Sequence, residues 1–346
     1  MHLLHRIIFT GLMFISWELN AQVALPTFQA VQATPKGLYS FSSHTFTNCG
    51  ATGKTGPTLA NCKSSYDVTW EDNTDFFNVQ TQGIQEWTVP TTATYTIEVW
   101  GAAGGTQLYS GDYPGGYGAK MKGDFDLTKG DVIKIIVGQK GENTRSTNID
   151  NAAPGGGGGS FVWKSSGSAL LIAAGGGGGG GRSSHNGIHA NSSTSGNAAN
   201  GLSNGGSSGN GGTSNAGGSS WWAGGGAGWL NDGTGGNQST NYNYSPGQYG
   251  AYGGRKPLNG GTGGTRYNDG NDEGGDGGFG GGGGGGSDNM GTGGGGGYSG
   301  GGGNRGSGSN KTGGGGGSYN GGSNTTNTAG SSIEWSDHGK VTITVN

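Results

Sequence analysis

Apolar and polar residues alternate along several short segments of the chain, which predicts β-strands. These segments are rich in β-branched and aromatic residues and are bounded by glycine or proline. They occupy Ser40–Thr47, Gly83–Val89, Thr94–Trp100, Ala119–Leu127, Asp131–Gly138, Ser332–Trp335 and Lys340–Val345. Thr128–Gly130 lies between two of them and predicts a hairpin connection. Helical periodicity with capping residues is absent along the chain, so we expect an all-β fold.

Two further predicted strands lie next to unbroken glycine. Ser160–Trp163 follows the run Gly155–Gly159, and Ala169–Ala174 precedes the run Gly175–Gly181. A flexible linker does not need a strand pair inside it, and a sheet is weakened by glycine at its ends. The glycine-rich region therefore needs a structure other than helix, strand or random coil.

Glycine is concentrated in one part of the sequence. The chain has 346 residues and 88 glycines; the first 154 residues hold 17 and the last 16 hold one, so 70 lie between 155 and 330. Composition alone favours a disordered spacer for such a region. A collagen triple helix is excluded, because the strict period of glycine at every third residue is missing and prolines are few.

A packed alternative to the spacer is a bundle of glycine polyproline-II helices. Ordering glycine costs about 1–2 kcal/mol per residue, and this region has few apolar side chains to offset that cost. Without Cβ atoms, however, such helices can lie side by side and bond through their N–H and C=O groups. Aromatic residues near the runs could close the margins of the bundle; they are Trp221, Trp222, Trp229, Phe279, Tyr298 and Tyr319.

The N-terminus has the features of a secretory signal peptide. Met1–Arg6 is weakly basic, Ile7–Trp17 is mostly apolar, and Leu19–Ala21 offers a small residue for cleavage before Gln22. An ordinary hydrophobic strand is the alternative. The apolar segment is too short to span a bilayer, which needs about 20 residues. We expect export without a membrane span, to the extracellular space or a cell surface.

Charge and cysteine content refine this expectation. The net charge is −3 and basic residues form no block, so nucleic acid and anionic membranes are not implied as partners.

In an exported chain, the two cysteines Cys49 and Cys62 are expected to bond to each other. A loop this short stabilises the fold by roughly 3 kcal/mol. Two cysteines without nearby histidines are a poor zinc set.

The order of these features predicts a β-sandwich or jelly roll with an insertion. The last strand is separated from the others by the whole glycine-rich region, so that region is inserted and not appended. We expect a signal peptide at 1–21, a linker at 22–39, a sandwich at 40–154 completed by 331–346, and a polyproline-II insert at 155–330 that begins with the hairpin 160–174.

Several short motifs of enzymes occur without the context they need. The esterase pattern G-x-S-x-G occurs at Gly201–Gly205, Gly205–Gly209 and Gly297–Gly301, but glycine-rich composition produces it by chance and no strand-to-helix turn surrounds it. Gly53–Thr55 is similar to part of a phosphate-binding loop, yet Asn48 stands where its first glycine belongs. The signature motifs of protein kinases are absent.

Metal and catalytic sites are not indicated either. His185 and His189 lie in a segment without helical character, so they share no face. Asn268–Asp276 is acidic but lacks the glutamate that ends an EF-hand loop, and a solvated loop is the favoured interpretation. The Asp337–His338 pair has no suitable serine partner. We therefore expect no catalytic residues, no cofactor and no metal.

Seven segments of the chain form a recognisable set. They are Phe46–Tyr66, Gly83–Gly105, Asp131–Glu142, Gly155–Lys164, Leu170–Gly178, Gly277–Gly285 and His338–Val345. The most specific parts are the cysteine loop, GIQEWTVP and LLIAAGGGG. Together they resemble one family, the glycine-rich extracellular domain of the anaplastic lymphoma kinase and leukocyte tyrosine kinase receptors. The resemblance covers roughly residues 40–346.

This resemblance implies a TNF-like β-sandwich with an inserted bundle of glycine polyproline-II helices that binds small protein ligands. It also implies that Cys49 and Cys62 form the disulfide of the family. The chain departs from the receptors because their further cysteines and their EGF-like, transmembrane and kinase parts are missing. Their acidic ligand-contact positions have no assignable equivalents, so the ligand-binding residues are unknown.

We interpret the chain as a secreted, non-enzymatic binding or adhesion module with a protein or surface-glycan ligand. One alternative is a structural or ice-binding protein, which predicts regularly spaced threonines or other short side chains along one face; the sequence shows no such spacing. Another alternative is a soluble ectodomain-like fragment of a kinase-type receptor.

Overall fold

The computed structural model describes residues 37–108, 111–144, 152–181, 185–200, 203–214, 222–235, 251–267, 274–286, 291–304 and 311–346. The chain separates into a short unit, residues 1–35, and a main unit, residues 36–346. The expected signal peptide and nearly all of the expected linker lie outside the described residues. All the described residues belong to the main unit.

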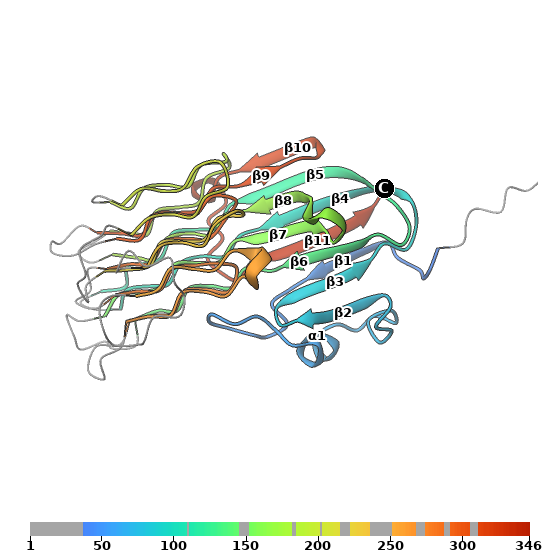
Figure 1. Cartoon of the computed structure of the whole chain (residues 1–346), viewed down its shortest axis with the longest axis horizontal. Coiled ribbons are helices and arrows are strands. Elements are labelled where there is room, and N and C mark those ends of the chain that lie inside the picture. The colour runs from blue at the N-terminus through green and yellow to red at the C-terminus, as the bar shows by residue number, and fades with distance from the viewer. Residues whose placement is uncertain are drawn as a thin grey trace, which may run out of the picture. The chain divides into compact units, whose positions relative to one another are not determined.

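Two antiparallel sheets form the framework of the main unit (Figure 1). The first sheet contains, in spatial order, β1 (Ser43–Phe46), β11 (Lys340–Val345), β4 (Ala93–Trp100), β5 (Lys120–Leu127) and β10 (Ser323–Thr328). The second sheet contains, also in spatial order, β2 (Phe77–Thr81), β3 (Ile84–Thr88), β6 (Val132–Ile136), β7 (Ser160–Lys164), β8 (Leu170–Ala174) and β9 (Tyr319–Asn320). The expected all-β sandwich is confirmed; the TNF-like likeness stays a prediction.

The last strand, β11, lies inside the first sheet and not at its edge. β11 pairs with β1 on one side and with β4 on the other, with Ile343 opposite both His44 and Ile97. The chain therefore returns to the interior of a sheet, between β1 and β4, after the glycine-rich region. β7 and β8 pair with each other as the sequence predicts, with Val162 opposite Ile172.

The apolar faces of both sheets meet in one core. Strand alternation places the buried side chains of each strand on the same side, where they remove apolar surface from water. The largest contributors from the first sheet are Phe46, Tyr95, Ile97, Met121, Leu127, Val341 and Ile343. Those from the second sheet and its flanks are Phe77, Trp87, Ile133, Ile135, Val162 and Ile172.

Two local predictions are wrong. The hairpin expected at Thr128–Gly130 does not form, because β5 belongs to the first sheet and β6 to the second. The chain passes from the first sheet to the second at Thr128–Gly130. There the N–H of Gly130 donates to the carbonyl of Val89, the residue that follows β3. The strand expected at Ser332–Trp335 is wrong; the 3-10 helix η3 (Gly330–Ser332) lies there instead.

The sequence also missed a capped helix and three strands. α1 (Leu59–Ser65) begins at Thr58, whose side chain accepts from the N–H of Asn61 in a capping box. The strands β9 and β10 lack an apolar alternation, and β2 (Phe77–Thr81) has one over only five residues. β10 is nearly all polar because it is an exposed edge strand, so burial imposes no pattern on it.

The described glycine runs pack side by side and bond to one another, as Figure 1 shows for the coil segments that leave the strands. The N–H of Gly157 donates to the carbonyl of Gly177, Gly176 donates to Gly296, and Gly296 donates back to Gly157. These runs are buried, which differs from a solvated spacer. The polyproline-II conformation and the exact limits of the insert stay predictions.

Side chains from the glycine-rich region also cover the outer face of the second sheet. Trp229 and Phe279 pack against residues of β3, β6, β7 and β8, forming a second apolar cluster; it contains Ile84, Ile136, Phe161, Trp163, Ala173, Trp229 and Phe279. Tyr298 and Tyr319 stack at its margin with ring centroids 5.0 Å apart. Trp222 is buried elsewhere in the region, and Trp221 lies outside the described residues. Two further 3-10 helices are η1 (Ser166–Ser168) and η2 (Pro257–Asn259).

Candidate functional site

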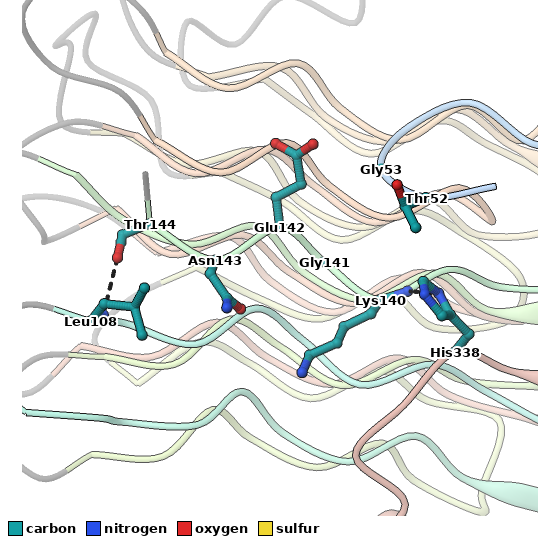
Figure 2. A pocket seen from close by; sticks show the side chains of 9 residues that line it. All are labelled: Thr52, Gly53, Leu108, Lys140, Gly141, Glu142, Asn143, Thr144 and His338. Atoms are coloured by element: carbon teal, nitrogen blue, oxygen red, sulfur yellow. Dashed lines mark hydrogen bonds between the residues drawn. The ribbon is translucent and has the colours of Figure 1, made fainter. Parts of the chain in front are cut away.

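An open cavity of about 520 Å³ lies where the disulfide-closed loop meets the segment that follows β6 (Figure 2). We call it the junction cavity. Its walls come from four parts of the chain: the cysteine loop, the segment after β4, the segment after β6 and the residue two positions before β11. The lining residues are Thr52, Gly53, Leu108, Lys140, Gly141, Glu142, Asn143, Thr144 and His338.

The cysteine loop is held in place by its disulfide and by α1. Cys49 and Cys62 are bonded, with 4.9 Å between their Cα atoms, which confirms the predicted pair. Both are buried in the core between the sheets, and Cys62 lies within α1. This anchoring fixes the two ends of the loop that carries Thr52 and Gly53 to the cavity.

The tip of the same loop is fastened to the glycine-rich region. The Lys54 ammonium lies 3.5 Å from the Asp276 carboxylate and donates to Thr265 Oγ1 at 3.0 Å. The carbonyl of Gly53 accepts from the N–H of Phe279. Within the protein, Lys54 of the incomplete phosphate-loop motif is thus paired with an aspartate and a threonine.

On the opposite wall, His338 bonds to the backbone of the segment after β6. Its Nδ1 accepts from the N–H of Lys140 at 3.0 Å, and its carbonyl accepts from Trp335 Nε1 at 2.7 Å. Burial lowers the pKa of His338 below its usual value, and the nearby charge of Lys140 lowers it further, against the opposing effect of Asp337. His338 is therefore neutral at pH 7, with its proton on Nε2.

Two polar side chains bridge the segments after β4 and β6. Asn143 Oδ1 accepts from the N–H of Thr106 at 2.8 Å, and Thr144 Oγ1 accepts from the N–H of Leu108 at 3.0 Å. These bonds satisfy backbone donors that no sheet partner reaches. They also set the orientation of the Asn143 amide toward the cavity.

Glu142 contributes a carboxylate whose role is structural. Its Oε2 accepts from the N–H of Asp276 at 3.1 Å, which ties the cavity wall to the glycine-rich region. In Figure 2 the Glu142 carboxylate points away from the side on which Lys140 and Asn143 lie. Asp276 in turn accepts from the N–H of Arg266 at 2.7 Å.

The cavity is lined by apolar as well as polar groups, and among the described residues no hydroxyl that lines it is hydrogen-bonded to His338. Nucleophilic catalysis needs a nucleophile bonded to a base that is itself oriented by a third group. Asp337 gives His338 no such support, since its side chain accepts from the backbone N–H of that neighbour. Within the described ranges, His, Cys, Asp and Glu side chains form no group of three that could hold a metal ion.

Residues of two other sequence motifs make hydrogen bonds within the fold. Ser299, at the centre of one esterase-like match, is buried and accepts from the N–H of Gly209. His189 Nδ1 accepts from the N–H of Tyr117, and its ring stacks on that tyrosine. The first six residues of Asn268–Asp276 lie outside the described part of the chain.

Sequence reasoning named Gly53, Lys54 and His338 singly, and the segment Asp131–Glu142 that contains Lys140, without bringing them together. It had no signal for Asn143 or Leu108, since they are single polar or apolar residues in coil. Only the crossing of four distant segments brings them together.

A second, smaller cavity of about 330 Å³ lies between η2 and the second sheet, beside Trp163 and the ion pair of Lys134 with Glu86.

Comparison with known proteins shows similarity over part of the chain. No family model matches the chain. Over 98 residues, the chain is 34% identical to the leukocyte tyrosine kinase receptor of Mus musculus. The matched segment covers 28% of this chain and 11% of the receptor. The matched part thus spans about a tenth of the receptor. This similarity agrees with the resemblance stated from the sequence and supports a receptor-related domain.

The described residues contain no helix of the length and apolarity needed to cross a membrane.

Proposed function

We propose that this protein is an exported, non-enzymatic binding module that holds an extracellular protein or surface-glycan ligand at the junction cavity. One observation carries the proposal: four distant segments assemble an open cavity of about 520 Å³ with hydrogen-bonding groups in its walls. A volume in this range suits recognition of a small ligand or of a projecting part of a larger one. The partial similarity to a protein named as a receptor supports the same class of function.

The experiment is a binding survey with the purified full chain. Immobilised protein is incubated with a glycan array and an array of extracellular proteins, and retention is compared with that of two variants. Thr52→Trp places a large ring at the exposed cavity mouth, while Thr326→Trp makes the same change on the exposed strand β10. We expect at least one ligand whose retention is lost in Thr52→Trp and kept in Thr326→Trp.

Retention of no ligand by the unmodified chain, or equal retention by both variants, would count against the proposal. Thermal unfolding of the variants separates loss of binding from loss of folding. If Thr52→Trp lowers the melting temperature, the smaller change Thr52→Leu provides the comparison.

A second function, binding to a regular surface such as ice, is favoured by one feature of the first sheet. Its outer face brings together short hydroxyl side chains from three strands, with Ser43 opposite Thr344 and Thr344 opposite Thr96. A neighbouring row pairs Thr45 with Thr342. Strands lie about 4.7–4.9 Å apart, so these hydroxyls form a small regular grid. An ice-recrystallisation assay tests this function; growth of ice crystals at the rate of a buffer control would exclude it.

A further inference from the structure

Hydrogen bonds within the junction cavity occupy one acceptor site on each of three side chains and leave donor groups free. His338 Nδ1, Asn143 Oδ1 and Thr144 Oγ1 each accept from a backbone N–H. A neutral imidazole that accepts at Nδ1 carries its proton on Nε2, and an amide that accepts at Oδ1 keeps both N–H groups of Nδ2. The cavity therefore offers N–H and O–H donors to a ligand.

Lys140 adds a positive charge to this set of donors. Within the described part of the chain, its ammonium has no ion-pair partner, in contrast to Lys54, which pairs with Asp276. Figure 2 shows the Lys140 side chain extending along the side of the cavity where the Asn143 amide lies. An unpaired ammonium beside an amide donor is suited to a carboxylate, because charge-assisted bonds are about twice as strong as neutral ones.

Glu142 is the one carboxylate of the cavity, and its position leaves the donor side open. Its Oε2 is bonded to the N–H of Asp276, and the group points away from Lys140 and Asn143 (Figure 2). An anion at Lys140 would therefore lie on the side of the cavity where the Asn143 amide lies, away from the Glu142 carboxylate.

We propose that the junction cavity binds a carboxylated sugar, a uronic acid, with its carboxylate at Lys140 and its ring oxygens at Asn143 and His338. This inference rests on the proposed function and names the ligand class of the same site. Hydroxyl groups rotate and can accept the hydrogen bonds that the cavity offers.

Calorimetric titration of the full chain tests the inference with matched probes. The probes are trigalacturonate, which carries carboxylates, and galactotriose, which is neutral. We expect trigalacturonate to bind and galactotriose to bind at least about tenfold more weakly. Lys140→Gln should weaken trigalacturonate binding by about tenfold or more, whereas Lys122→Gln, an equal charge change on the outer face of β5, should leave it unchanged.

Equal binding of both trisaccharides, or unchanged binding by Lys140→Gln, would overturn the inference. A triglutamate peptide that binds as tightly as trigalacturonate would overturn the assignment to a sugar. If trigalacturonate does not bind but the binding survey finds another ligand at the cavity, this inference falls and the proposed function stands. If the survey retains nothing, the proposed function itself falls.

Discussion

Lys54 and Asp276 form an ion pair of 3.5 Å that joins the disulfide-closed loop to the glycine-rich region. The Asp276 side chain is only 8% exposed and also lies 3.5 Å from Arg266 NH1. Glu142 accepts from the N–H of the same aspartate. The pair is therefore the centre of a charged network that connects three parts of the chain beside the junction cavity.

Replacing the buried aspartate should destabilise the fold. Asp276→Asn keeps the shape but leaves Lys54 and Arg266 without their carboxylate, which costs about 2 kcal/mol, since both cations are partly exposed. Asp72→Asn is the matched control, because Asp72 is 84% exposed and its pair with Lys63 is 4.0 Å long. Urea unfolding should show a clear loss for the first variant and about 0.5 kcal/mol or less for the second. Equal losses would contradict the role of the network.

A methyl group added inside the glycine-rich region should be tolerated poorly. A Cβ at Gly295 would lie 2.1 Å from the carbonyl oxygen of Gly176, and backbone atoms cannot move away as a flexible side chain can. We expect Gly295→Ala to cost about 3 kcal/mol. At Gly167 the space is open and only the positive φ of 67° restricts the residue, so Gly167→Asn should cost less than about 1 kcal/mol. Thermal unfolding of both variants measures the difference; a tolerated alanine at 295 would argue against close packing of the glycine runs.

Loss of the disulfide should weaken the attachment of the cysteine loop. Replacing Cys49 and Cys62 together by serine removes the constraint on a 13-residue separation and should cost about 3 kcal/mol. Because the loop also holds Phe279 through the carbonyl of Gly53, hydrogen exchange should accelerate at Gly53 and Phe279 more than at the central strand β4. Uniform acceleration across the main unit would mean that the disulfide acts on global stability alone.

Acidic pH should destabilise the sandwich through His44. Its ring packs edge-on against Phe46, Tyr66 and Trp70, and burial lowers its pKa from 6.5 to about 4. Between these values the unfolded chain binds the proton and the folded chain does not. Stability is therefore full above pH 6.5 and falls as the pH drops toward 4, by on the order of 2 kcal/mol after allowance for partial exposure.

The measurement for this prediction is the urea midpoint between pH 7 and pH 4. His44→Phe keeps an aromatic ring in the same place without a titrating group. Its midpoint should fall less over this range than that of the unmodified chain. Parallel pH profiles for the two proteins would contradict the assignment to His44.

The local pattern was sufficient for most strands because one face of each strand is buried and the other is not. Thr94–Trp100 and Lys340–Val345 alternate clearly, and both form central strands of the first sheet. The capped helix α1 was missed because its signal, Thr58 with Asn61, is short and lies inside the cysteine loop. β10 was missed because an exposed edge strand carries no burial pattern.

The junction cavity could not have been predicted in the same way. Lys140, Asn143 and His338 lie in coil, where neither periodicity nor composition marks a residue as special. Their proximity depends on which sheet each strand joins. That choice is made by long-range packing, as the crossing at Thr128–Gly130 illustrates.

By itself, the sequence determined the all-β class, the Cys49–Cys62 pair and the strands beside the glycine runs, since propensity and redox chemistry act locally. It left open whether the glycine runs are packed or solvated. Only the tertiary structure decided the division of strands between two sheets, the return of β11 to the interior of the first sheet and the junction cavity. The physical reason is that contacts between distant segments depend on how the buried faces of the two sheets pack together. The alternation within one strand does not specify which other strand it will pair with.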